Sequence, residues 1–483
     1  MNRLFFLLGF LSACGTLFGQ TAEDALRYSF VTPLGTARYA GTGGALSPLG
    51  VDFTTTSTNP AGIGWARNGY VVITPGFKIE SIESSLINDA NPRNQSQDVN
   101  QFALPSIGVL FPSQTNSLYW STLNFAVGLN RIADFNETIF FRGNSAGSIM
   151  ESFVEDANDG IFNDFRNELA FDPDVNAILE DSLGFFSDFD SNPDGIIRRE
   201  GIVTRTGSMN EFVLSIGGNY REKLMWGLTL GVPFLNFRET REYDEIDEND
   251  EILFFDDLSF NETLENTGSG VNFKIGFIYR ATQALRISLA AHTPTFWSID
   301  ETYETDFTYN FTDEDGAQGG TAQSPRSEIT YNLQTPWRLM GGIGAIINKK
   351  GFVSLDVEYV SYAANKFSFD DFTVEAEAAN EEVDNLLESG FSARLGGEYN
   401  LKPLLLRAGF GVRQSPIIGD DEVYLNAAIG AGYRFDRYFI DAAYTYNSRE
   451  RIFQPYSTFA VEPQQVNSTF TRHNFLLSAG VFF

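Results

Sequence analysis

The sequence predicts an all-β protein: a transmembrane up-and-down barrel of about 14 antiparallel strands with an N-terminal hatch. Three observations support this prediction. Apolar and polar residues alternate along most of the 483 residues, the connections between strands alternate between short and long, and the chain ends on a phenylalanine that completes an alternating strand. Aromatic residues make up 14% of the chain and Gly occurs 44 times, a composition typical of many twisted strands.

Residues 1–19 predict a secretory signal peptide. A basic residue precedes an apolar stretch that ends at Phe18, and cleavage after the small Gly19 fits this pattern. Residues 11–14 also resemble a lipobox, which would leave Cys14 lipidated at the mature N-terminus. Because Cys14 is the only cysteine, we expect no disulfide in the mature chain.

Residues 20–66 predict a hatch inside the barrel. Residues 22–28 have the pattern of a short helical turn, whereas residues 35–65 are too rich in Gly, Thr, Ser and Pro to bury a core of their own. Such a segment needs the wall of a larger structure as its core.

Residues 67–483 predict the barrel itself, and its last strand has the clearest alternation. One face of that strand carries Phe475, Leu477, Ala479, Val481 and Phe483, and the other carries Asn474, Ser478 and Gly480. This terminal pattern resembles the signal by which outer-membrane barrels are recognised, so we expect the barrel-assembly machinery to bind the strand that ends at Phe483.

The connections predict how the strands are arranged. The expected strands are 67–81, 100–112, 117–134, 207–220, 224–242, 266–280, 284–303, 328–347, 350–368, 389–400, 403–413, 423–435, 437–449 and 470–483. Every second connection is tight and the others are long, the largest being an insertion at 135–206 with helix-like pieces near 148–158 and 175–183. Alternation alone fits a soluble sandwich equally well, but this sorting of the loops favours a barrel with long extracellular loops and short periplasmic turns.

Charge excludes one class of partner. The net charge of −30 argues against nucleic acid, whose phosphates need clustered Lys and Arg, and residues 243–265 are acidic without any Lys or Arg. We expect a monomer in the outer membrane of a Gram-negative cell, in contact with outer-membrane lipid and a hydrophobic small-molecule ligand.

The N-terminal region resembles the FadL/TodX family of outer-membrane transport proteins, in the style of its Bacteroidetes-type members. The resemblance rests on residues 23–28, 35–38, 41–45 and 59–63, with Asn59-Pro60-Ala61 as its best marker. It implies a barrel closed by an N-terminal hatch and passive uptake of long-chain fatty acids or aromatic hydrocarbons.

The same resemblance implies that Asn59, Pro60 and Ala61, with Gly43 and Gly44, belong to a hatch that shifts to open a path. Pro60 fixes its own φ and restricts Asn59, and the glycines permit turns that other residues cannot make. The alternative is that these residues fold a static plug.

The resemblance also implies a kinked third strand that opens sideways to the membrane. In this chain Arg131 falls on the lipid-facing phase of that strand. This could mark a bulge, or the strand could already have passed the membrane interface there.

Three lumen-facing arginines, Arg286, Arg338 and Arg407, are candidates for binding the head group of an amphipathic anion. Acidic residues share their phase, so the alternative is a charge ladder that braces the barrel.

A second candidate site is for calcium. Asp190, Asn192 and Asp194 resemble the first half of a calcium loop, but its twelfth position is Gly201, and a solvated turn is the alternative.

We expect no cofactor and no enzymatic activity. The chain has only two histidines, and a hydrolase built on Ser288 and His292 lacks a group that would orient the histidine. The leading hypothesis is a channel for hydrophobic small molecules. Its rival is a non-transporting scaffold like the PorV components of type IX secretion, which the 135–206 insertion and the acidic loops would suit. Haem uptake is a weaker option, because no evident iron ligand pair exists.

Overall fold

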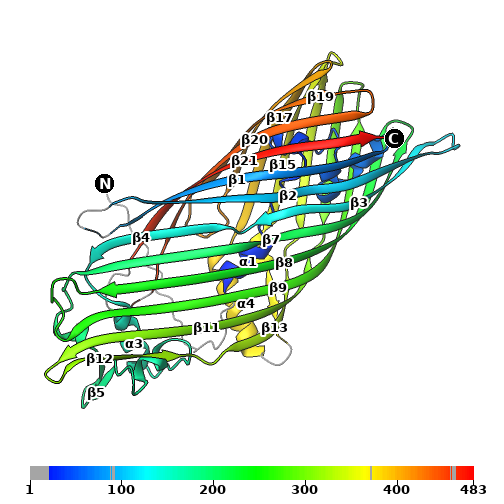
Figure 1. The fold of residues 1–483 in the computed structure, drawn as a ribbon. Coiled ribbons are helices and arrows are strands. Elements are labelled where there is room, and N and C mark those ends of the chain that lie inside the picture. Colours follow the sequence, from blue (N-terminus) through cyan, green and yellow to red (C-terminus); the bar gives the residue numbers. More distant parts are fainter. Residues whose placement is uncertain (1–20, 88, 90–92, 370–372, 457, 459–463) are drawn as a thin grey trace, which may run out of the picture.

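The computed structural model shows a closed barrel of 14 antiparallel strands, several of which are interrupted (Figure 1). It describes residues 21–483 except 88, 90–92, 370–372, 457 and 459–463, so the predicted signal peptide and Cys14 lie outside the described residues. The first half of the wall is formed by β1 (Tyr70–Leu86), β2 (Gln95–Gln114), β3 (Trp120–Asp134) with β4 (Glu137–Ser145), β7 (Ile197–Tyr220), β8 (Leu224–Ile246), β9 (Phe255–Arg280), and β10 (Leu285–His292) with β11 (Phe296–Asp313). The second half is formed by β13 (Ser327–Gln334) with β14 (Arg338–Ile347), β15 (Gly351–Ser361) with β16 (Lys366–Ser368), β17 (Ser389–Leu401), β18 (Leu404–Gln414), β19 (Val423–Arg434), β20 (Tyr438–Phe453) and β21 (Val466–Phe482).

Pairing between the first and last strands closes the barrel. β1 and β21 are antiparallel from Tyr70 opposite Phe482 to Leu86 opposite Val466. The tight turns suit this twisted wall: Arg221 and Glu222 both have positive φ, as do Asn348 and Lys349, which is the conformation of two-residue hairpin turns. The predicted up-and-down barrel is therefore confirmed.

The exposure of the strand faces decides between a barrel and a sandwich. Along β9, Phe273 and Phe277 are 58% and 42% exposed, whereas Lys274 between them is 5% exposed. The same inversion recurs on β18, where Leu406 is exposed and Arg407 is buried. An apolar outer face around a polar interior is the arrangement of a barrel in lipid. None of the described helices is long and apolar enough to cross a membrane.

The strands continue further toward the long loops than the sequence predicts. The acidic stretch 243–265, expected to be a loop, contains the end of β8 and the start of β9, which pair from Ile246 to Leu224. Polar residues there still alternate, but their apolar partners are too sparse to reveal a strand without its neighbours.

A folded cap covers the long-loop end (Figure 1). It contains α3 (Ile149–Asn158), η3 (Asn167–Phe171), β5 (Leu179–Asp181), β6 (Gly184–Phe186) and η4 (Asp188–Ser191). Beside it, β12 (Gly316–Gln323) pairs with β11 and extends the wall. A helix over 175–183 was the wrong prediction. Asn176 has a φ of 51°, which interrupts a right-handed helix, and residues 179–186 form a small hairpin instead.

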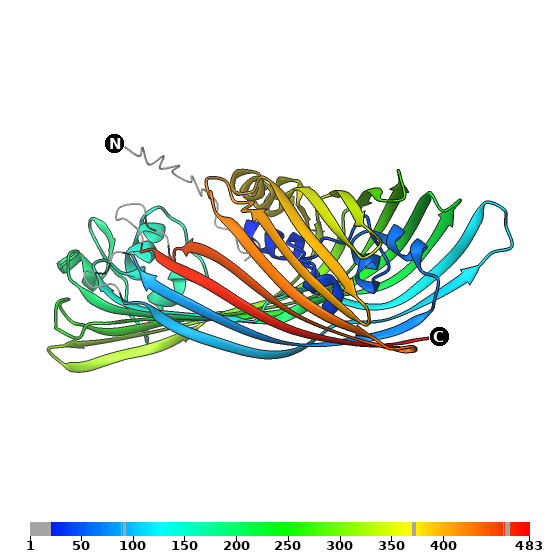
Figure 2. The same ribbon diagram turned by 90° about the horizontal axis from the view of Figure 1, so that it is seen from above.

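The N-terminal segment, which we define as residues 21–66, lies inside the ring of strands (Figure 2). It contains α1 (Ala22–Ser29), α2 (Ala37–Gly41), η1 (Phe53–Ser57) and η2 (Pro60–Trp65). After β15 the chain forms the short helix η5 (Tyr362–Ala364), then β16, and then the helix α4 (Thr373–Leu386). Ala379 and Val383 of α4 are buried in the same apolar cluster as Ala22 and Ala25 of α1.

Candidate functional site

Side chains that point inward from the barrel wall bind the backbone of the N-terminal segment. Ser478 accepts a hydrogen bond from the Ala37 amide at 2.8 Å, and Asp356 accepts one from the Ser47 amide at 2.9 Å. From β3, Asn124 donates to the carbonyl of Ile63 at 2.6 Å. These bonds satisfy buried backbone groups that a Gly- and Thr-rich segment cannot pair by itself.

Asn59, Pro60 and Ala61 form the start of η2 and are fully buried or nearly so. The Asn59 side chain accepts from the Ala61 amide at 3.1 Å and donates to the Ser47 hydroxyl at 3.0 Å. Asn59 thus caps η2 and ties it to the preceding loop. Whether this unit moves stays a prediction.

Glycines in the wall let the segment approach closely. A Cβ atom at Gly276 would lie 2.0 Å from Oδ1 of Asn59, and one at Gly227 would lie 2.2 Å from the Pro60 carbonyl oxygen. Within the segment, Gly43 and Gly44 have φ of +63° and +80°, a left-handed conformation that favours glycine. A side chain at any of these positions would push the segment away from the wall.

We therefore expect Gly227→Val to displace η2 and raise the ion conductance of the purified protein in planar lipid bilayers. Overpacking of this kind costs about 1–3 kcal/mol, enough to shift a locally bonded segment. The matched control is Gly341→Val, because a Cβ there meets only a leucine methyl at 3.9 Å. Equal conductance for the two variants would contradict the close fit.

The wall is interrupted between β2 and β3. In the described residues their pairing runs only from Gln114–Thr122 to Ser106–Asn130, although both strands continue on their other sides. The register of β3 against β7 shifts between Arg131 and Ala133, which is the expected bulge. Whether this part of the strand lies within the membrane stays a prediction.

The N-terminal segment covers the edge of β3 that β2 leaves free. The amides of Thr32 and Leu34 donate to the carbonyls of Ile132 and Arg131 at 2.9 and 3.4 Å. Across the same gap, Lys78 of β1 donates to Asp134 at 2.5 Å. Backbone pairing and an ion pair therefore close the interruption.

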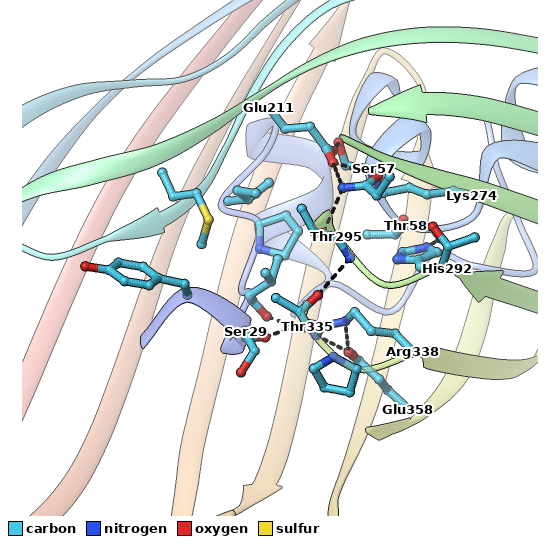
Figure 3. Close-up of a pocket in the computed structure, with 18 of the residues that line it drawn as sticks. Ser29, Ser57, Thr58, Glu211, Lys274, His292, Thr295, Thr335, Arg338 and Glu358 are labelled. Carbon is cyan, nitrogen blue, oxygen red and sulfur yellow. Dashed lines mark hydrogen bonds and ion pairs between the residues drawn. The ribbon is translucent and has the colours of Figure 1, made fainter. Parts of the chain in front are cut away.

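A narrow cavity, which we call the inner pocket, lies between the segment and the wall beside this bulge (Figure 3). Its volume is about 40 Å³, room for a few water molecules and no larger guest. The apolar part of its lining includes Val31, Pro33, Ile132, Met209, Trp297 and Met340. Its polar part includes an ion pair between Lys274 and Glu211 and a second one between Arg338 and Glu358.

The three candidate arginines do not converge on one site. Arg338 lines the inner pocket and donates to the Ser29 carbonyl at 3.0 Å. Arg407 is buried between Glu398 and Asp441, at 2.7 Å from each, which is the bracing arrangement. Arg286 lies 4.0 Å over the ring of Trp65 and donates to the Leu49 carbonyl at 3.2 Å.

The sequence did not reveal how α1 is held. Glu23 accepts ion pairs from Arg205 and Arg451, each at 3.0 Å, from strands far away in the chain. Burial alone would raise the pKa of Glu23, but these guanidinium groups and that of Arg27 hold it well below its usual value.

Ser288 and His292, the two residues of the hydrolase alternative, both contact the N-terminal segment. His292 contacts the Thr58 carbonyl at 2.6 Å and Ser288 contacts the Ser47 hydroxyl at 3.0 Å, so both side chains hold the N-terminal segment.

In the cap, Asp190 accepts from the Ser187 amide and Asn192 donates to the Glu251 carbonyl. In the described part of the chain no three His, Cys, Asp or Glu side chains form a group that could hold a metal ion. Calcium binding that includes Asp194 stays a prediction.

A second cavity, the short-turn chamber, lies against the middle of the segment, at the short-turn end of the barrel. It has a volume of about 710 Å³ and is bounded by residues 36–53 of the segment, the start of β1 and the turn ends of β17–β21. Among the described residues it shares no lining side chain with the inner pocket. The N-terminal segment therefore separates the two spaces.

No family model and no curated protein matches the chain. Solved structures do match. A FadL homologue of Pseudomonas aeruginosa is 11% identical with a TM-score of 0.56, covering 93% of this chain and 99% of the other. The toluene transporter TodX of P. putida is 12% identical with a TM-score of 0.52, covering 94% and 99%. The toluene transporter TbuX of Ralstonia pickettii is 13% identical with a TM-score of 0.50, covering 93% and 98%. The chain therefore has the FadL-family fold that its N-terminal motifs predicted.

Proposed function

We propose that this protein is an outer-membrane channel for the passive uptake of hydrophobic small molecules, and that residues 21–66 close it. The observation that carries the proposal is the position of the N-terminal segment between two separate cavities inside a barrel with an apolar exterior. A segment held there by hydrogen bonds and ion pairs, and joined covalently to the wall only where it leads into β1, is suited to a hatch.

The barrel interior around α1 and α4 suits an apolar cargo. Buried aromatic and aliphatic side chains gather there around α1 and α4, among them Phe237, Trp297, Tyr331, Leu333, Tyr362 and Phe367. An open path through this cluster would expose apolar surface. A hydrophobic molecule would cover that surface favourably, whereas its hydration by water costs free energy.

Two routes past the hatch are available to such a molecule. It can pass along the barrel axis if η2, with Asn59, Pro60 and Ala61, shifts from the wall. It can also leave sideways at the bulge of β3 if residues 32–34 release the strand edge. The solved neighbours include a FadL homologue and two toluene transporters, and this likeness of fold supports a channel by analogy alone.

The acidic, folded insertion between β4 and β7 favours the rival function, a scaffold that holds other proteins at the cell surface. Uptake assays separate the two. Deletion of the gene should reduce the entry of radiolabelled oleate or toluene into whole cells, and the wild-type gene should restore it. Unchanged uptake, together with accumulation of unsecreted proteins, would overturn the channel and support the scaffold.

A further inference from the structure

The short-turn chamber is large enough for a small-molecule ligand, and its wall is amphipathic. Its apolar side contains Tyr70, Phe439 and Phe482, whose ring centroids are 5.1–6.1 Å apart, together with Val72 and Leu405. Such an aromatic and aliphatic surface binds the hydrocarbon part of a ligand.

Ion pairs lie directly beside these rings, and the guanidinium of Arg434 is 5.0 Å from the centroid of the Phe439 ring. In the two pairs whose cations line the chamber, the carboxylate is less exposed than its partner. Arg38 of the N-terminal segment pairs with Glu398 at 3.0 Å, and Arg434 pairs with Asp441 at 2.9 Å. The side chains of Arg38 and Arg434 are 20% and 28% exposed, against 11% for Glu398 and 1% for Asp441.

The other charges in the wall strengthen this asymmetry. Asp52 is buried and accepts hydrogen bonds from the Thr36 hydroxyl and the Thr54 amide. Lys402, in the turn between β17 and β18, is exposed. Although the chamber is lined by equal numbers of acids and bases, the charge that a guest would meet is positive.

We propose that the short-turn chamber binds an amphipathic carboxylate, with its tail against Tyr70, Phe439 and Phe482 and its head group between Arg434 and Lys402. This inference rests on the proposed channel function and specifies one of its two substrate classes. A neutral hydrocarbon would cover the aromatic side but would displace water from the cations without replacing its hydrogen bonds, which is unfavourable.

The site also touches the hatch. Among the described ion pairs, Arg38–Glu398 is the one that joins residues 30–66 to the wall. The chamber lies on the short-turn side of the N-terminal segment. A carboxylate that has passed the hatch would therefore bind there before it leaves the barrel.

Photo-crosslinking of the full-length protein in lipid nanodiscs tests the proposal. The probe is palmitate with a diazirine near the end of its chain, and the matched neutral probe is the corresponding fatty alcohol. We expect the palmitate probe to label peptides 70–72, 401–405 and 434–441, and the alcohol to label them weakly.

The double variant Lys402→Gln/Arg434→Gln should lower the palmitate labelling about tenfold, the loss expected for a charge-assisted hydrogen bond. Asp441 keeps Arg407 as a partner in this variant, so the wall stays paired. The control Arg221→Gln/Lys349→Gln removes the same charges from the β7–β8 and β14–β15 turns, which do not line the chamber, and should leave labelling unchanged.

The outcomes separate this site from the channel. Labelling around the inner pocket alone, with intact oleate uptake by cells, would overturn the chamber and leave the channel standing. Equal labelling by palmitate and alcohol would overturn the selection of a carboxylate. If palmitate labels no part of the lumen and the gene does not support uptake by cells, the channel function itself is contradicted.

Discussion

Locking the N-terminal segment to the wall by a disulfide is expected to reduce uptake of labelled oleate to the level of a deletion strain. The pair Gly41→Cys and Ala443→Cys suits this bond. A Cβ atom at Gly41 would lie 3.6 Å from the Ala443 Cβ, within the range of natural disulfides. The same Cβ would lie 3.1 Å from the Cα of Gly430, so that strand must yield by a few tenths of an ångström.

An added oxidant should form a disulfide only between the two introduced cysteines, because Cys14 is the only native cysteine and lies in the predicted signal peptide. Oxidised double-variant cells should lose uptake, and a reductant should restore it in the same cells. Each single-cysteine variant serves as a control for the substitutions themselves. Full uptake in the oxidised variant would show that α2 stays in place during transport, which favours the static-plug alternative.

Much of the barrel could be predicted because its signals are local. Alternation along one strand shows the two faces, and the lengths of neighbouring connections show their order, so the predicted strands occur in their places with their turns. What failed was the extent of the strands. Residues 243–246 and 255–265 lack apolar alternation, and they become strands only through pairing with each other and with β7 and β11.

The candidate site was predictable only where it depends on local backbone chemistry. Gly43, Gly44 and Asn59-Pro60-Ala61 carry their turn preferences in the residues themselves, and the structure shows those turns. The three arginines were chosen by lumen phase alone, and phase does not say at which height along the barrel a side chain lies.

Partners far apart in the chain could not be found this way. Glu211 and Lys274 are 63 residues apart, and Glu23 and Arg451 are even further apart. Their contacts follow from the register of β7, β8 and β9 and from the place of α1 in the lumen, and neither leaves a pattern in the sequence.

Breaking the Glu211–Lys274 pair is expected to have the largest effect on stability. Glu211 is 1% exposed and accepts hydrogen bonds from Lys274 and from the Ser57 hydroxyl of the N-terminal segment. Glu211→Leu leaves Lys274 buried with Asn272 as its remaining partner. An uncompensated buried charge of this kind costs about 3–5 kcal/mol.

Urea unfolding in lipid vesicles, followed by tryptophan fluorescence, measures this loss as a lower midpoint. The double variant Glu211→Leu/Lys274→Met should recover most of it, because the remaining cation is gone and the two apolar side chains can pack together. Glu265→Leu breaks an exposed pair with Arg238 and should cost about 1 kcal/mol or less. If Glu211→Leu and Glu265→Leu unfold at the same urea concentration, Lys274 is hydrated in the native protein, and the segment seals the lumen less tightly than its contacts with Glu211 imply.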